Sequence, residues 1–210
     1  MPLIKEWNPG NYGLAAIWHV TEQEFFFTEY TGVVSDIKNE KRRLERLAGR
    51  YLLKHLQEDF PLHAIAPDPH DKPRIDEDKY FFSISHSWPY VAAVVDPEDE
   101  AGIDIQCWHP RILGIQHKFL SAEEQEMFGN DEQLVTLAWA AKEAVYKWMG
   151  RRGIDFIEHM PITYFAKGDE YSLMIYAKGR QIPMMVTVTG VLTEHYACAY
   201  VTGTEEWAIY

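Results

Sequence analysis

A helical segment followed by several short strands occurs twice along this chain of 210 residues. In the first half, apolar residues repeat with helical spacing from about Ser35 to Gln57, and Ser35 or Asp36 can cap this helix. In the second half, a similar pattern runs from about Glu132 to Met149. The repeated order predicts an α+β fold with a pseudo-twofold arrangement of two similar helix-plus-antiparallel-sheet halves.

Strand patterns accompany both helices. Segments rich in aromatic and β-branched residues occur at 13–20, 24–30, 80–85, 90–95 and 102–106, and again at 162–165, 171–177, 184–189 and 196–201. We expect the three strands between residues 80 and 106 to form a meander. We place the division between the halves after residue 105, so that residues 1–105 and 106–210 form one compact unit with the active site between them.

The charge and hydropathy patterns disfavour two classes of partner. A formal charge of −12 argues against non-specific binding to nucleic acid, which requires a basic surface. The apolar stretches are far shorter than the about 20 residues of a membrane-spanning helix. The first residues also lack the pattern of a secretory signal, so we expect a cytoplasmic protein.

One segment of the chain is nevertheless basic. Between Lys38 and Lys54 there are seven basic and two acidic residues. Within it, Arg43, Arg46, Arg50 and Lys54 have helical spacing and form a basic stripe beside the apolar one. The stripe is either a solvated helix face or a binding surface for an anionic ligand.

Two acidic residues are candidates for chemistry. Asp104 alternates with isoleucines in a predicted strand, so its side chain should face a cleft or solvent. Glu143 lies four residues before Lys147, on the same face of the second helix. Glu143 and Lys147 can form an ordinary surface ion pair. Alternatively, the two acids jointly hold Mg²⁺, which prefers a few carboxylate oxygens.

A polar cluster ends one of the predicted strands. Ser85, His86 and Ser87 follow the apolar start of the segment that begins at Phe82. Their hydroxyl and imidazole groups can donate to phosphate oxygens, or they form a polar turn. A serine nucleophile with a histidine base is disfavoured, because adjacent strand residues point to opposite faces and no G-x-S-x-G segment is present.

Six segments follow one another in a characteristic order: Lys41-Arg-Arg…Gly49-Arg50, Lys72-Pro73, Phe82-Ser-Ile-Ser-His-Ser87, Gly102-Ile-Asp-Ile105, Phe119-Leu-Ser…Glu124 and Trp139-Ala-Ala-Lys142-Glu143-Ala…Lys147. In this combination the sequence resembles the Sfp-type 4′-phosphopantetheinyl transferase family. The resemblance implies transfer of 4′-phosphopantetheine from coenzyme A to a serine of an apo acyl or peptidyl carrier protein, with release of adenosine 3′,5′-bisphosphate.

The resemblance also implies roles for individual residues. Asp104 and Glu143 would ligate Mg²⁺. Because of its place beside the metal, Glu143 is also our candidate general base, acting directly or through a metal-bound water. The remaining expected roles are catalysis by Lys142 and Lys147 and coenzyme A binding by Lys41, Arg42, Arg50, Lys72, Ser85, His86, Asp104 and Lys147.

Two further positions bear on the number of metal ligands. Gln106 stands where some family members have a further acid, so we expect at most two charged ligands. Glu124 aligns with another acid of the family, but Ser121 and Glu124 also fit a helix capping box.

Two rival functions are a degenerate homologue that binds coenzyme A or a carrier without transfer, and a Mg²⁺-dependent phosphohydrolase that uses the same acids. Two fused halves provide the active site within one chain, so we expect a monomer. The basic segment or its edge is expected to attract an acidic carrier.

Overall fold

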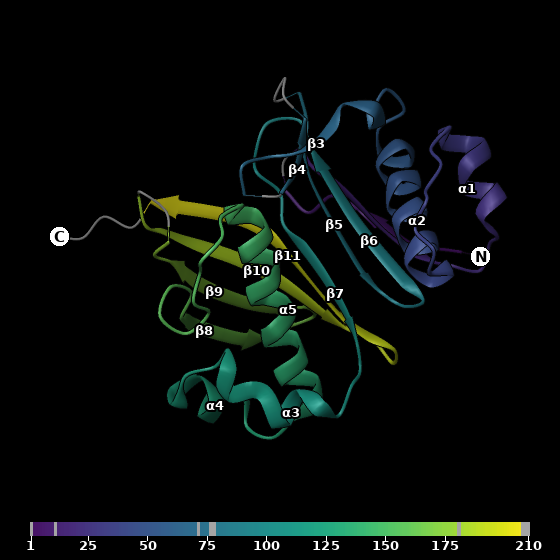
Figure 1. The fold of residues 1–210 in the computed structure, drawn as a ribbon. Coiled ribbons are helices and arrows are strands. Elements are labelled where there is room, and N and C mark those ends of the chain that lie inside the picture. The colour runs from purple at the N-terminus through teal and green to yellow at the C-terminus, as the bar shows by residue number, and fades with distance from the viewer. Residues whose placement is uncertain (1, 11, 71, 76–78, 180–181, 207–210) are drawn as a thin grey trace. The chain divides into compact units, whose positions relative to one another are not determined.

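The computed structural model describes residues 2–10, 12–70, 72–75, 79–179 and 182–206 (Figure 1). The chain separates into two compact units, Met1–Ala101 and Gly102–Tyr210. Each unit combines helices with an antiparallel sheet, which confirms the predicted α+β class. Among the described residues, none of the helices has both the length and the apolar character needed to cross a lipid bilayer.

The described residues of the first unit form β1 (Leu3–Trp7), β2 (Leu14–His19), α1 (Glu24–Thr31), α2 (Glu40–Leu56), a 3₁₀ turn (Leu62–Ala64), β3 (Ile65–Pro67), β4 (Pro73–Ile75), β5 (Phe81–Ser87) and β6 (Tyr90–Asp96). Its main sheet has the strand order β1-β2-β6-β5, with all neighbours antiparallel. Strands β3 and β4 form a separate hairpin.

Helix α2 packs against the main sheet of the first unit with the predicted apolar stripe. Leu47, Ala48 and Leu52 on this stripe are fully buried. The predicted caps, Ser35 and Asp36, were wrong. The helix begins later, and Asn39 caps it by accepting a hydrogen bond from the backbone N–H of Arg42.

The segment predicted as a strand at residues 24–30 is helix α1, so that prediction was wrong. Its aromatic residues favour strands when judged by propensity alone. In the fold, Phe27 is fully buried in the core, and Arg43 of α2 forms an ion pair with Glu24 at 2.7 Å. Packing against α2 therefore outweighs the local preference.

The second unit contains β7 (Ile103–Cys107), α3 (Arg111–Ile115), a 3₁₀ turn (Gln116–Lys118), α4 (Ala122–Phe128), α5 (Glu132–Met149), β8 (Ile162–Lys167), β9 (Tyr171–Ala177), β10 (Met184–Leu192) and β11 (Tyr196–Glu206). The strand order of its sheet is β7-β11-β10-β9-β8. Helix α5 and the four strands after it confirm the predictions for this part of the chain.

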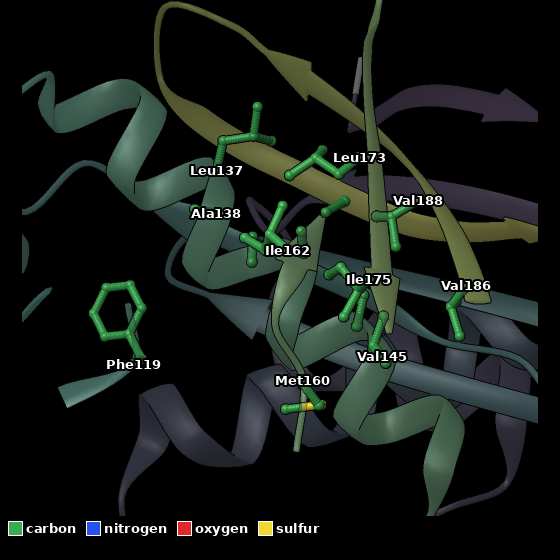
Figure 2. Packing of buried hydrophobic residues seen from close by; sticks show 14 of the residues in the cluster. Phe119, Leu137, Ala138, Val145, Met160, Ile162, Leu173, Ile175, Val186 and Val188 are labelled. Carbon is green, nitrogen blue, oxygen red and sulfur yellow. The ribbon is translucent and has the colours of Figure 1, made fainter. Parts of the chain in front are cut away.

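The core of the second unit lies between α5 and the sheet (Figure 2). Leu137, Ala138 and Val145 of α5 are fully buried, as are Leu173 and Val188 on the strands. A buried side chain of this size contributes about 1.5–3 kcal/mol relative to its exposed state. This packing fixes the helix that carries Glu143 and Lys147.

Strand β7 pairs with β11 and not with β6, so the predicted meander was wrong. The strand belongs to the second unit, which begins at Gly102, whereas the division that we predicted after residue 105 falls inside β7. In both units, the strand that precedes the helices pairs antiparallel with the last strand: β2 with β6, and β7 with β11. The two halves thus share this part of their connectivity.

Helix α5 passes very close to the start of β7. A side-chain carbon added at Gly102 would overlap the backbone oxygen of Ala144 and lie 2.9 Å from Cβ of Trp148. Only glycine leaves room for this approach. The absence of a side chain at Gly102 therefore sets how near the residues of β7 come to those of α5.

Candidate active site

Asp104 is the central acidic residue of the second unit. Its side chain is 2% exposed, and its Oδ1 atom lies 2.6 Å from Nζ of Lys147 on α5. The Nε2 atom of Gln106 donates a hydrogen bond of 2.8 Å to Oδ2 of Asp104. Asp104 therefore does not face solvent. It is buried beside α5, with a cation and an amide held against it.

Glu143 is close enough to Asp104 to be affected by its charge, but its own carboxylate has fewer stabilising contacts. Among the described residues, none forms a hydrogen bond or a close ion pair with its side chain. Burial and, secondly, the negative charge of Asp104 raise the pKa of Glu143 to about 7, against a smaller lowering effect of Lys147. The site thus carries negative charge that the surrounding protein only partly neutralises.

The two carboxylates fit a small divalent cation. Asp104 and Glu143 supply oxygen atoms of the kind that Mg²⁺ prefers, whereas Gln106 directs its Nε2 atom toward Asp104. A cation between the two carboxylates would relieve the repulsion that raises the pKa of Glu143. Among the described residues, no group of three or more His, Cys, Asp or Glu side chains is placed to hold a metal.

Lys142 lies apart from this pair, although it precedes Glu143 directly. Successive helical residues are about 100° apart around the axis, so Lys142 faces the core and not Asp104. Its side chain is fully buried and donates hydrogen bonds of 2.8 Å to the carbonyl oxygens of Phe119 and Phe156. We therefore assign it a structural role in place of the catalytic one that we expected.

Glu124 is the ionic partner of Lys142, with 2.7 Å between Oε1 and Nζ. It also accepts hydrogen bonds from the backbone N–H groups of Ser121 and Ile162, at 2.7 and 2.6 Å. The capping box with Ser121 is confirmed. These contacts join α4, α5 and β8. They explain the position of Glu124 as a structural residue, without a metal.

Apart from Lys147, the basic residues expected to bind phosphate lie in the first unit. Lys41 and Arg42 are exposed on the first turn of α2, and Nζ of Lys41 lies 5.8 Å from the ring centre of Trp88. Arg50 is half-buried, and no described residue forms a hydrogen bond or an ion pair with it. Burial and the charge of Arg46 lower the pKa of Arg50 to about 10. A half-buried guanidinium without a counter-ion favours an anionic ligand.

Lys72 belongs to a second group of charges in the same unit. Its Nζ atom lies 2.7 Å from Glu100, which also pairs with Arg74 at 2.6 Å. Burial lowers the pKa of Lys72 despite the attraction of Glu100. Lys72, Arg74, Glu100 and neighbouring residues line a pocket of about 10 Å³, space for about one water molecule. A phosphate would have to share Lys72 with Glu100.

Ser85 and His86 take opposite directions on β5. Ser85 is buried, whereas the His86 side chain is 54% exposed. The Nδ1 atom of His86 lies 3.3 Å from Oε2 of Glu45 on α2. Glu45 was not predicted from the sequence. Its burial could have been inferred from its spacing, because Glu45 lies three and seven residues before the buried Ala48 and Leu52, on the same face of the helix.

Residues 100–201 match the family model of the 4′-phosphopantetheinyl transferase superfamily. This segment belongs to that superfamily. The match covers β7 and α5, which carry Asp104, Glu143 and Lys147, and it supports phosphopantetheine transfer as the general reaction. No curated protein matches the chain. The resemblance stated above is confirmed at the superfamily level, and the Sfp-type assignment remains a prediction.

We predict that Lys142→Met destabilises the protein by about 3–5 kcal/mol, because it leaves the buried carboxylate of Glu124 without its cation. Unfolding in guanidinium chloride measures the loss. The control Lys118→Met, at an exposed position, should change stability by less than about 0.5 kcal/mol. The double variant with Glu124→Gln should cost less than the sum of the single changes. Additive losses would contradict the structural pairing.

We also predict that Glu143→Gln stabilises the metal-free protein at pH 8 but not at pH 4. The folded-state pKa of about 7 exceeds the ordinary glutamate pKa of 4.5. Ionisation therefore destabilises the fold as the pH rises from about 4.5 to 7, and the neutral amide avoids a cost of about 2–3 kcal/mol. Unfolding across this pH range with a chelator present tests it, with exposed Glu126→Gln as control. A difference independent of pH would refute the prediction.

Proposed function

We propose that the chain transfers 4′-phosphopantetheine from coenzyme A to a serine of an apo acyl or peptidyl carrier protein. The observation that carries this proposal is the pair formed by the buried Asp104 and the uncompensated Glu143, with Lys147 beside them, in a superfamily segment of that reaction class. We further propose that the protein is a cytoplasmic monomer.

Coenzyme A is the proposed ligand of the cations in the first unit. Its three phosphates require several positive groups, and Lys41, Arg42, Arg50, Lys72 and His86 supply them. Arg50 is the strongest candidate, because its guanidinium is half-buried and has no counter-ion among the described residues. Ser85 is retained as a hydroxyl donor near the same strand end, with less support because it is buried.

Mg²⁺ is the proposed metal at Asp104 and Glu143. When bound, it neutralises charge on the pyrophosphate oxygens and holds the reacting phosphoryl group in place. Gln106 contributes an amide oxygen only if its side chain turns over, since its Nε2 atom now faces Asp104. Lys147 provides a fixed cation next to the same carboxylate.

In the proposed reaction, the carrier serine oxygen attacks the β-phosphorus of coenzyme A. A new bond forms between that oxygen and phosphorus, and the bond to the bridging oxygen breaks, releasing adenosine 3′,5′-bisphosphate. Glu143 accepts the serine proton, a role supported by its place beside the proposed metal. Lys147 stabilises the charge that develops on the phosphoryl oxygens.

Mass spectrometry of apo carrier proteins incubated with the protein, coenzyme A and Mg²⁺ tests the proposal. We expect a carrier to gain the mass of phosphopantetheine. Asp104→Ala should abolish the gain, and Glu143→Gln should lower turnover by about 10²-fold or more if Glu143 is the base. Unchanged turnover of Glu143→Gln with normal metal binding would contradict that role.

The same experiment separates the rival functions. A degenerate binding protein would bind coenzyme A measurably but modify no carrier. A phosphohydrolase would release inorganic phosphate from nucleotides without any carrier. Either result would overturn the proposed transfer.

A further inference from the structure

We propose that Glu45 is a positioning residue, which holds the ring of His86 in place for binding a phosphate of coenzyme A. This inference rests on the proposed function, in which His86 contacts the ligand. It assigns a specific task to an acid that lies within the basic segment of α2.

Burial and contact single out Glu45. Its side chain is 6% exposed, although it lies on a helix rich in exposed basic residues. Its contact among the described residues is with Nδ1 of His86, at 3.3 Å. Taking a carboxylate out of water is costly unless a partner compensates it. The burial of Glu45 therefore depends on His86.

The arrangement of α2 and β5 makes this contact possible. A side-chain carbon at Gly49, one turn after Glu45, would lie 2.9 Å from Cγ2 of Ile84. Glycine at this position lets the helix approach the strand closely, and Ile84 lies two residues before His86 on the same face of β5. Glu45 and His86 are thus brought together by packing between helix and strand.

The chemistry of the ring explains what the contact does. A carboxylate only accepts hydrogen bonds, so the contact is attractive when Nδ1 carries a hydrogen. A phosphate facing Nε2 likewise requires a hydrogen there. The contact with Glu45 engages Nδ1 and leaves Nε2 to face the ligand. The exposure of the ring, 54%, leaves it accessible to a ligand.

Other charges near Glu45 do not replace this function. On α2 its neighbours at helical spacing are Lys41 and Arg42, both exposed, and Arg46 follows it directly and is also exposed. These cations attract the ligand themselves. They would also attract Glu45 into solvent, so its buried position beside His86 reflects the specific contact.

The test is a binding cycle measured by calorimetry with adenosine 3′,5′-bisphosphate and with coenzyme A. Glu45→Gln and His86→Ala should each weaken binding by about three- to tenfold. In the His86→Ala background, Glu45→Gln should add less than about twofold, because its effect acts through the ring. The control Glu40→Gln, an exposed acid in the first turn of α2, should change affinity by less than twofold in either background.

Nitrogen-15 spectra of the ligand-free protein give an independent readout. The ring signals of His86 should shift in Glu45→Gln, which loses the ion pair with Nδ1, and should stay unchanged in Glu40→Gln at the same pH. The inference would be overturned if Glu45→Gln weakened binding equally in the wild type and in His86→Ala, or if it left the His86 signals unchanged. In either case, transfer by the wild type would leave the proposed function intact. Absence of coenzyme A binding and transfer by the wild type would overturn both.

Discussion

The close approach of α5 to the start of β7 underlies the chemistry of the second unit. Because Gly102 has no side chain, Ala144 and Trp148 of the helix pack directly against the strand. This approach lets Lys147 reach Asp104 two residues further along β7, and it places Glu143 within the field of the same carboxylate. The core of α5 and the strands then holds the helix in this position.

Within the part of the chain that the structure describes, each unit contains a half-buried ionisable side chain without a close partner of opposite charge, an acid in the second unit and a base in the first. We call these two the electrostatic deficits. In the second unit, the described residues leave Glu143 without a close cation, and its pKa rises. In the first unit, Arg50 lacks an anion, and its pKa falls. Both deficits cost stability in the ligand-free protein. A divalent cation would relieve the first deficit, and an anionic ligand would relieve the second.

Much of the fold was predictable because local pattern and tertiary packing agree. The apolar periodicity of α5 and the alternation in β9 led to correct bounds. Helix α1 was not predicted correctly. Its run of aromatic residues favours a strand by local propensity, and the helix forms because it packs against α2. Asp104 and Glu143 were selected from the sequence, and their role as metal ligands stays a prediction. The burial of Lys142 could not be predicted, because it depends on carbonyl groups from distant segments. The partner of His86 likewise depends on the packing of α2 against β5.

The account requires the carboxylate pair and coenzyme A to act through the same metal. Calorimetric titration of coenzyme A with and without Mg²⁺ measures this coupling most directly, in the wild type and in Asp104→Asn. We predict that Mg²⁺ tightens binding to the wild type by about tenfold or more and to Asp104→Asn by less than about twofold. An equal effect of Mg²⁺ on both proteins would contradict the account, because the metal would then act on the ligand without Asp104.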